Sequence, residues 1–585
     1  MSNKIDSFNN TLAFIFVLIF LLPILFIFLN LFTATTDVWI HIKTYLLEEY
    51  VINSLIIVFF VALFTILIGT SLAWLVSMYD FPGVNLFKWL LIIPMAIPTY
   101  INAFIYSGLN ETSGIFFNFF EYYFGLGPFI YNLYNVQNIY GVIFVMSISL
   151  YPYVYLLCLP AFANHSYSVF EVGKSLGLNQ YQRMTKIGIP IVRPAVIAGV
   201  SFVIMETLAE YATMEYFGVP TFATGIFRAW FVLGDDVSSL RLSSILLTLV
   251  FFLIYFEEIS RGKRNFDNPT NKVYKRKKEI PDNKALPTFL CSLVLFFGFI
   301  LPLIQIFYWI SYSFEEINII FLAELIASST GIALLSAITI IIFTLNISFI
   351  SRITKNIFTK MSIKIFSLGY AIPGVVLAVG VIAPITYMEK SFAKLFDYPP
   401  ETLLTGTFML LIAAYLVRFS TISIKTIDSG FNKISRNYDL VSESLGYSKI
   451  QTLLKVHAPI LLPTVYSALI LLFVDIVKEL PMTLILRPFN FTTLPVYLYE
   501  LAEAENLSSI GLPGLILEVS DDKTTILCTK IVMNPKEKGK IKRPKKGKVI
   551  SNQDFVKLQD EKRVEAREMW QKARERRQSS TARLR

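Results

Sequence analysis

Long apolar runs recur along this sequence of 585 residues and constrain its fold more than any other feature. A helix needs about 20 mostly apolar residues to cross a bilayer. In lipid a chain must satisfy its backbone hydrogen bonds internally, so these runs predict spanning helices. The runs are 11–33, 51–78, 88–108, 139–162, 191–215, 241–258, 287–312, 321–350, 361–386, 402–420 and 461–483. We therefore predict an all-α polytopic membrane protein with about 11 transmembrane helices.

Composition supports the membrane assignment. Only 16% of the residues are charged and 55% are hydrophobic, whereas an ordinary soluble domain has about 25% charged residues. Three cysteines and three histidines are scattered along the chain. Their spacing encodes neither a disulfide framework nor a Cys/His metal site, so we assign no metal ligand.

The short loops differ in their content of Lys and Arg, which sets the expected orientation. Residues 163–193, 259–286 and 425–455 are basic, whereas 109–138 contain no Lys or Arg. Basic loops face the cytoplasm. Alternation of the spans then predicts a cytoplasmic N-terminus and, after 11 spans, a periplasmic C-terminal tail.

One segment occurs twice, and its two copies align without a gap. VGKSLGLNQYQRMTKIGIPIVRP (172–194) and VSESLGYSKIQTLLKVHAPILLP (441–463) are identical at nine of 23 positions. We call this alignment, which sets position 172 against 441, the repeat register. An earlier Ile-Pro pair, 97–98 and 372–373, is matched in the same order. We predict two similar halves, residues 1–260 with six spans and 287–507 with five, joined by a basic cytoplasmic linker, 261–286.

The repeated segment has the pattern of a short helix, a glycine turn and a second helix. Its Gly173-Lys174-Ser175 is similar to the end of a phosphate-binding loop, but Ser168 stands where that loop needs a glycine. We therefore predict no nucleotide binding here. An amphipathic helix on the inner face suits docking to a cytosolic partner. An ordinary connecting loop is the alternative, and the duplication favours docking.

At these residues the chain resembles the permeases of ATP-binding-cassette (ABC) importers. Their cytoplasmic signature is Glu-Ala-Ala, three residues, Gly, then about nine residues to Ile-x-Leu-Pro. The second copy departs from it, because Leu440 replaces the glutamate and Asp439 or Glu443 is the nearby carboxylate. The resemblance implies ATPase contacts at Glu171, Gly177, Ile187 and Pro190, and at Glu443, Gly446, Val456 and Pro459.

The fusion of two halves in one chain limits the resemblance to a few groups of importer permeases. Residues 206–231 and 478–502 resemble the ferric-iron importer permeases, and the thiamine importer permeases are similar. The resemblance implies a non-enzymatic permease subunit of the bacterial inner membrane that moves iron(III) by alternating access. Its implied partners are membrane lipid, an extracytoplasmic solute-binding protein and two copies of a cytosolic ATPase, which bind the ATP and Mg. No nucleic acid or cofactor of its own is implied.

Two alternatives remain for the function. One is a permease for thiamine or another small solute. The other is a secondary transporter, whose repeats are often inverted, whereas these two halves share one orientation.

Four acidic residues lie in or at the ends of apolar spans: Glu206, Glu210, Asp475 and Glu479. Within each pair the residues are one turn apart, on one helix face. Charges inside a membrane are costly and usually face a cavity or each other. We expect these acids to line a cation-favouring translocation cavity. The alternatives are a polar lock between helices through Lys478, or positions in the wet interface.

The composition changes near residue 508. Residues 509–585 hold 20 Lys and Arg against 10 Asp and Glu, which accounts for the whole net charge of +10. Residues 508–585 are predicted to form a basic, non-membrane α+β tail in place of a twelfth span, with a β-hairpin around Asp521-Asp522. GLPGLILEV (511–519) resembles the motif of the exported GLPGLI family. The other interpretation is a gene-model or assembly join that replaced the last span.

Overall fold

A computed structural model describes the chain in segments. They are residues 17, 20–109, 114–127, 136–164, 172–261, 280–281, 283–313, 319–353, 362–363, 365–366, 368–396, 404–503, 518–520 and 525–527. The chain divides into two compact units, Met1–Gly514 and Leu515–Arg585, and each is described by itself.

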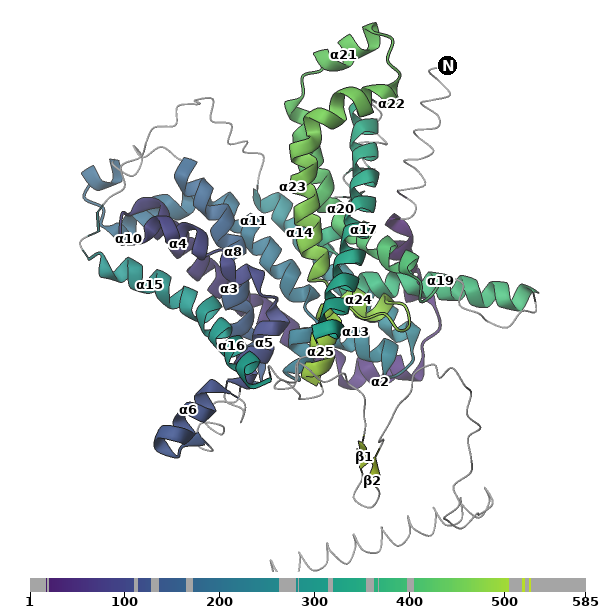
Figure 1. Ribbon diagram of the computed structural model, residues 1–585, viewed down its shortest axis with the longest axis horizontal. Helices are drawn as coiled ribbons and strands as arrows, with labels where there is room; N and C mark the ends of the chain where they lie inside the picture. The colour runs from purple at the N-terminus through teal and green to yellow at the C-terminus, as the bar shows by residue number, and fades with distance from the viewer. Residues whose placement is uncertain are drawn as a thin grey trace, which may run out of the picture. The chain divides into compact units, whose positions relative to one another are not determined.

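The first unit is built of helices throughout its described residues (Figure 1). Helix Phe20–Phe32, whose last turn is η1 (Asn30–Phe32), opens the first half. It continues with α2 (Asp37–Tyr45), α3 (Leu47–Met78), α4 (Val84–Leu90), η2 (Ile93–Ala96), α5 (Thr99–Gly108), α6 (Ile115–Phe124), α8 (Ile139–Asn164), α10 (Gln180–Arg183), η3 (Met184–Gly188), α11 (Ile189–Ala209), α12 (Ala212–Tyr216), α13 (Phe222–Phe231) and α14 (Asp236–Arg261).

The second half follows a similar order. It comprises α15 (Ala285–Leu295), η4 (Phe296–Ile300), α16 (Leu301–Ser313), α17 (Ile319–Ile353), η6 (Gly369–Ala371), α19 (Gly374–Phe396), α20 (Phe408–Lys433), α21 (Asn437–Ser444), α22 (Lys449–Thr452), η7 (Leu453–His457), α23 (Ala458–Val477), α24 (Pro481–Leu486) and α25 (Leu494–Glu503). Helices α8 and α20 begin at positions that the repeat register aligns, as do η3 and η7, so the repeat in sequence is also a structural one.

Nine helices in the described residues are long and apolar enough to span a membrane, or 11 if each of two bent helix pairs is one span. The predicted all-α polytopic class is therefore confirmed. Four predicted spans are wrong in their boundaries, because each is interrupted within its range: 88–108, 191–215, 361–386 and 461–483. Helix α11 ends at Ala209, α19 begins at Gly374, and α23 ends at Val477.

The matched Ile-Pro pairs explain one kind of interruption. Ile97 and Ile372 are extended, with ψ of 118° and 122°, and each follows a short 3-10 helix. A residue before proline is disfavoured in the helical region. The next helices, α5 and α19, start directly after Pro98 and Pro373, so the same dipeptide breaks the same span in both halves.

The halves exchange their first helices. Phe20 is fully buried and packs edge-on against Phe366 of the second half, with ring centroids 5.2 Å apart. In the other direction, Cys291 and Leu295 of α15 belong to the buried core of the first half. Tyr106 donates a hydrogen bond to the carbonyl of Phe297. The two halves therefore form one compact unit instead of two separate bodies.

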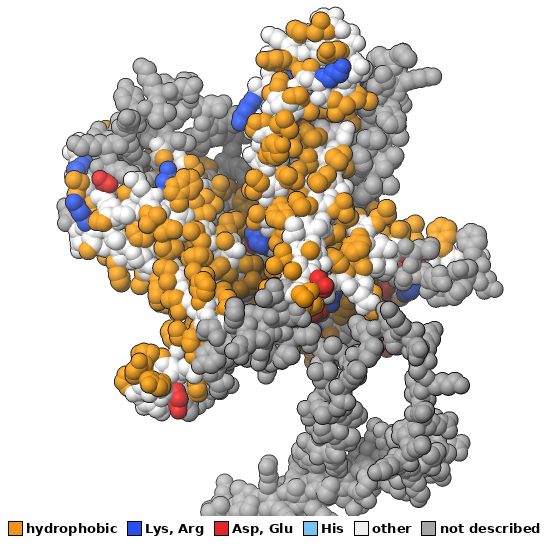
Figure 2. All heavy atoms as spheres, in the orientation of Figure 1, with side chains coloured by type: hydrophobic (Ala, Val, Ile, Leu, Met, Phe, Trp, Pro, Cys, Tyr) orange, Lys and Arg blue, Asp and Glu red, His pale blue; other side chains and the backbone are white. Residues whose placement is uncertain are grey.

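The outer surface of the first unit suits lipid. Figure 2 shows hydrophobic side chains over the middle of this face, and most of the visible Lys and Arg side chains near α10 at the left or near α21 at the top. The exposed apolar side chains of α3 and α23 include Leu55, Phe59, Leu63, Leu67, Leu462, Tyr466 and Ile470. An apolar surface this extensive is unusual on a water-soluble monomer.

The second unit contains a two-stranded antiparallel hairpin. Strand β1 (Glu518–Ser520) pairs with β2 (Thr525–Leu527), with Glu518 opposite Leu527 and Ser520 opposite Thr525. The structure therefore contains the predicted hairpin over these six residues. The expected Asp521-Asp522 turn and the helical part of the predicted tail lie outside the described residues.

Candidate functional site

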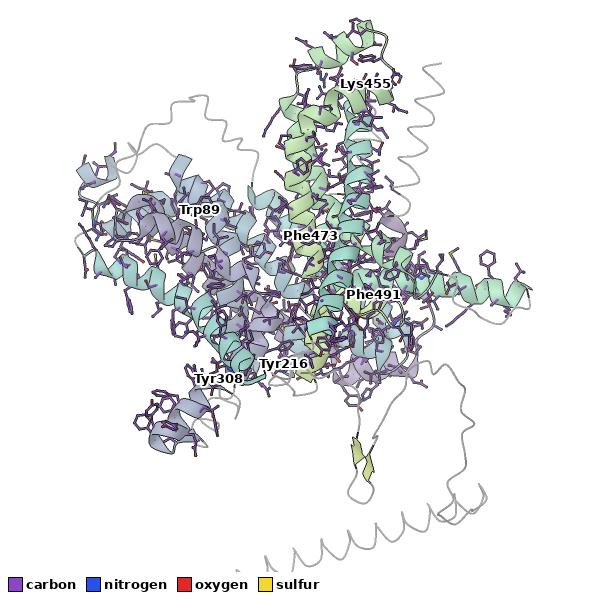
Figure 3. The ribbon with its side chains drawn as sticks, viewed as in Figure 1. Trp89, Tyr216, Tyr308, Lys455, Phe473 and Phe491 are labelled. Atoms are coloured by element: carbon purple, nitrogen blue, oxygen red, sulfur yellow. The ribbon has the colours of Figure 1, made fainter. Side chains whose placement is uncertain are left out.

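A cavity of about 130 Å³ lies between the two halves of the first unit. Equivalent elements of both halves line it: α8 and α20, the segment where α11 gives way to α12, and the segment where α23 gives way to α24. Figure 3 labels Phe473 on α23, just before the turn that reaches this cavity. The cavity thus sits at the pseudo-symmetric centre of the repeat.

The structure brings all four predicted acids to this cavity: Glu206, Glu210, Asp475 and Glu479. The expectation that each pair shares one helix face is wrong for the second member. Glu206 lies on α11 and Asp475 on α23, but Glu210 and Glu479 lie just beyond the ends of those helices.

Each of the two non-helical glutamates caps the short helix that follows it. Glu210 Oε1 accepts a hydrogen bond from the Thr213 backbone N–H at 2.9 Å. Glu479 Oε1 accepts one from the Met482 backbone N–H at 3.1 Å. The first turn of a helix has N–H groups without intrahelical partners, and a carboxylate satisfies them well. The acids therefore stabilise the breaks that place them at the cavity.

The other contacts of the acids join different parts of the unit. Thr99 Oγ1 donates to Glu210 Oε2 at 2.6 Å. The hydroxyl of Tyr370, from the second half, donates to Glu206 Oε1 of the first half at 2.7 Å. The ammonium of Lys478 lies 3.4 Å from Asp475 Oδ1 within its own turn, so the Lys478 ion pair is not a lock between helices.

Sequence reasoning missed Arg418, which also lines the cavity and is only 6% exposed. The available signal was a charged residue inside the apolar run 402–420, at a position that the repeat register aligns with the neutral Ser149. With Lys478 it gives two cationic side chains against four carboxylates. The formal balance of these six groups is negative, which favours a cationic cargo.

The acids do not form a tight metal site. Among the described residues, no group of three or more His, Cys, Asp or Glu side chains could hold a metal ion. The arrangement can therefore attract a hard cation by its field and by single oxygen contacts, without chelating it.

The repeated loop has the same local structure in both halves. Gly177 and Gly446 adopt the left-handed conformation, with φ of 79° and 77°. Just after each glycine, a backbone N–H turns back to a carbonyl of the preceding helical turn, Leu178 to Gly173 and Tyr447 to Ser442, at 3.1 Å in each case. Glycine is favoured at such helix C-termini because it has no Cβ.

The second helix of each loop starts and continues in matching ways. Asn179 with Gln182, and Ser448 with Gln451, make reciprocal capping contacts. Each short helix then passes through a π-helical turn, η3 or η7, directly before the helix that contains Pro190 or Pro459. Figure 1 shows α10 at the left of the first half and the α21–α22 pair at the top of the second half, and Figure 3 labels Lys455 beside that pair.

Both loops expose apolar side chains at equivalent positions. Three pairs that the repeat register aligns are exposed: Val172 with Val441, Leu176 with Leu445, and Tyr181 with Ile450. Leu176 is 75% exposed and Leu445 is 67% exposed. Matched apolar patches on two polar loops indicate a surface that a partner covers.

The other predicted loop residues differ in how far they are buried. Ile187 and Val456 are half-buried, whereas Pro190, Glu443 and Pro459 are exposed. Glu171 lies outside the described residues.

Asp439 has a role inside the second half. Its carboxylate accepts from Arg352 Nη2 at 2.7 Å, and His457 Nε2 lies 2.7 Å from its other oxygen. Arg352, at the end of α17, also donates to the carbonyls of Phe431 and Ile434. Asp439 therefore ties α21 to α17 and η7, while Glu443 remains the exposed carboxylate of this loop.

We expect Asp439→Asn to loosen the second loop. The change weakens two charge-assisted contacts, so the stability of the purified subunit should fall by about 1–2 kcal/mol, less than for a fully buried pair. Thermal melting in detergent and proteolysis of residues 437–452 would measure it. Glu443→Gln, an exposed carboxylate on the same helix, is the matched control. Equal behaviour of the two variants would contradict the anchoring role.

Comparison with known proteins gives consistent matches. Residues 65–256 match the family described as binding-protein-dependent transport system inner membrane component. Over 495 residues the chain is 23% identical to the Fe(3+)-transport system permease protein FbpB 2 of Haemophilus influenzae, covering 82% of this chain and 90% of that protein.

Two further relatives differ in the length that they match. The ferric transport system permease protein FbpB of Actinobacillus pleuropneumoniae is 23% identical, covering 72% of this chain and 62% of that protein. The sulfate transport system permease protein CysT of Salmonella typhimurium is 24% identical over only 28% of this chain and 56% of its own length.

Proposed function

We propose that this chain, whose residues 65–256 match the family of binding-protein-dependent inner membrane components, is the transmembrane subunit of an ABC importer for ferric iron. The observation that carries the proposal is the cavity between the halves, where two acids from each half meet. Similarity to ferric permeases over most of the chain supports the choice of iron.

The chemistry of the cavity fits a hard cation in transit. Carboxylate oxygens are suitable ligands for such ions. Because the acids do not converge into a chelating cluster in the described residues, the ion can leave as readily as it enters. Tight selection of the cargo then belongs to an extracytoplasmic solute-binding protein, which delivers iron to the outer side of the cavity.

The matched loops supply the link to ATP hydrolysis. Each presents three exposed apolar side chains at matched positions near a left-handed glycine, so each offers one docking surface to a cytosolic ATPase. Two loops imply two ATPase copies, which bind the ATP and Mg. Closure of the ATPases would draw the loops together and switch the cavity from outward to inward access.

The orientation and the tail are part of the same proposal. The basic loops support a cytoplasmic position for 172–194, 441–463 and the N-terminus, and hence a periplasmic tail. The GLPGLI-like motif at 511–519 would fit an exported tail, whereas a join that removed a twelfth span would leave the transporter impaired.

The test is uptake of radiolabelled ferric iron into cells that express this chain with its ATPase and binding protein. Uptake should depend on all three proteins, and it should stop when the ATPase cannot hydrolyse ATP. Radiolabelled thiamine is the cargo control. Thiamine uptake without iron uptake would contradict the iron assignment but would still support an ABC importer permease. Uptake that does not depend on the ATPase would indicate a secondary transporter.

A variant in which an ordinary spanning helix replaces 508–585 completes this experiment. If it restores iron uptake that the natural chain lacks, the tail is a defect. If both chains import iron equally, the tail is tolerated.

A further inference from the structure

Arg418 differs from the other arginine pairs of this unit. The guanidiniums of Arg228, Arg352 and Arg487 lie 2.9, 2.7 and 2.6 Å from their carboxylates. Arg418 Nε lies 3.9 Å from Glu479 Oε2, beyond hydrogen-bond distance, although Arg418 is only 6% exposed. A guanidinium that served only as the counter-ion of Glu479 would be expected at contact distance.

Two nitrogens of Arg418 are buried without a hydrogen-bond partner among the described residues. They are Nε and Nη1. A buried charged donor without an acceptor is unfavourable, so such groups normally have a partner. Because Arg418 lines the cavity, the missing acceptor is best supplied from the cavity itself.

The backbone next to Arg418 is shaped to admit its side chain. A Cβ on Gly374 would lie 2.5 Å from Arg418 Nη1 and 3.0 Å from Glu479 Oε1. The glycine therefore leaves space that the guanidinium occupies. Gly374 is the first residue of α19, directly after Pro373.

The first half fills the equivalent positions with neutral residues. Thr99 follows Pro98 as Gly374 follows Pro373, and the repeat register aligns Ser149 with Arg418. Thr99 donates to Glu210 at 2.6 Å, and Ser149 accepts from Asn102 at 2.8 Å. One side of the cavity therefore has a small neutral donor beside its glutamate, and the other side has a fixed cation.

We propose that Arg418 contacts an anionic oxygen ligand of the cargo, so that the cavity takes iron as a complex with a small oxyanion and not as a bare ion. This inference rests on the proposed function. The planar guanidinium presents parallel donors that match the oxygens of a carboxylate, carbonate or phosphate group. The acids, on α11, α23 and the adjoining breaks, face the metal side of the complex.

Charge and size are compatible with such a complex. A ferric ion with one dianionic ligand retains a single positive charge, which suits a cavity whose acids outnumber its cations. One water molecule needs about 10–15 Å³ of cavity volume, so a cavity of about 130 Å³ has room for an ion with a small ligand.

The experiment follows two labels in proteoliposomes that contain the complete transporter and its binding protein. Radiolabelled iron is supplied with radiolabelled inorganic phosphate, and in a second arm with radiolabelled citrate. We expect at least one anion to accumulate with iron in a fixed ratio and only with ATP. Arg418→Met should lower the entry of iron and anion together by about 10- to 100-fold, the loss expected for a charge-assisted hydrogen bond.

Two further variants separate an anion contact from other effects. Lys478→Met removes the same charge from the same cavity, but its ammonium already has Asp475 as a partner. It should preserve the ratio of anion to iron. Arg418→Ser with Gly374→Thr recreates the arrangement of the first half and gives Glu479 a neutral donor. This double variant should fold and assemble, and still lose the paired uptake.

The outcomes separate this inference from the proposed function. Iron that enters without either anion, or a double variant that transports like the natural chain, would overturn the role of Arg418 and leave the iron importer intact. No iron uptake by the natural chain would overturn both. Anion that enters without iron would likewise overturn both, because the cargo would then be a free oxyanion.

Discussion

Gly177→Asp combined with Gly446→Asp is expected to abolish ATP-driven uptake while the spans stay folded. Both glycines have φ near +80°, where a residue with a Cβ costs about 1–2 kcal/mol. Nothing lies within 4 Å of a Cβ built on either one, so the change strains only the loop. It also places a charge beside the exposed Leu176 and Leu445.

The size of the effect follows from two damaged docking sites. If each loop loses about 2 kcal/mol of its contact with the ATPase, uptake should fall by about 100-fold or more. ATPase activity stimulated by the binding protein should fall in parallel, and the amount of purified subunit should not change. Both quantities can be measured on the same preparation.

Gly406→Asp is the matched control. Gly406 also has a left-handed φ, 78°, and open space around its Cβ. It precedes α20, whose other end leads to the second loop, so the same strain falls far from the docking surfaces. Normal uptake is expected. If the loop variants transport as well as this control does, the loops do not couple the permease to an ATPase.

Phe20→Ala should destabilise the second half although Phe20 lies near the start of the first. Its ring is fully buried and packs against Phe366. Loss of a buried phenylalanine side chain costs about 3–5 kcal/mol. The measurement is thermal unfolding in detergent, together with proteolysis sites mapped in both halves. New cleavage is expected around 362–371, next to the space that the ring leaves.

Leu25→Ala, on the same helix, is the control for this prediction. Leu25 is 54% exposed, on the surface assigned to lipid, so its removal should change the unfolding temperature little. Equal destabilisation by the two variants would show that the helix matters for insertion only. Cleavage confined to the first half would contradict the exchange of first helices.

Sequence reasoning predicted the features that depend on local pattern. The apolar runs predicted the spanning helices, since run length and helix length are directly linked. The matched positions of Gly177 and Gly446 predicted a repeated turn, because left-handed backbone needs glycine. That the four acids act as a translocation lining remains a prediction, although the structure brings them together.

Other features depend on contacts between distant segments. The breaks at Glu210 and Glu479 were missed because a glutamate fits a helix equally well, and only the carboxylate-to-backbone caps end it here. Arg418 was missed because the space for its side chain depends on Gly374, which lies on a different helix. The exchange of first helices could not be predicted from hydrophobic periodicity, because a spanning helix can pack against the apolar surface of either half.

The fusion of the halves fixes the make-up of the cavity. If the halves were separate subunits, two identical copies could associate. The cavity of such a homodimer would then contain two copies of Arg418, or none, around the acids. A single chain gives each cavity one Ser149 side and one Arg418 side, at the high effective concentration that a tether provides. Covalent linkage therefore frees the two sides to diverge, so that a symmetric ancestor could become a cavity with one face for a metal and one for its counter-ion.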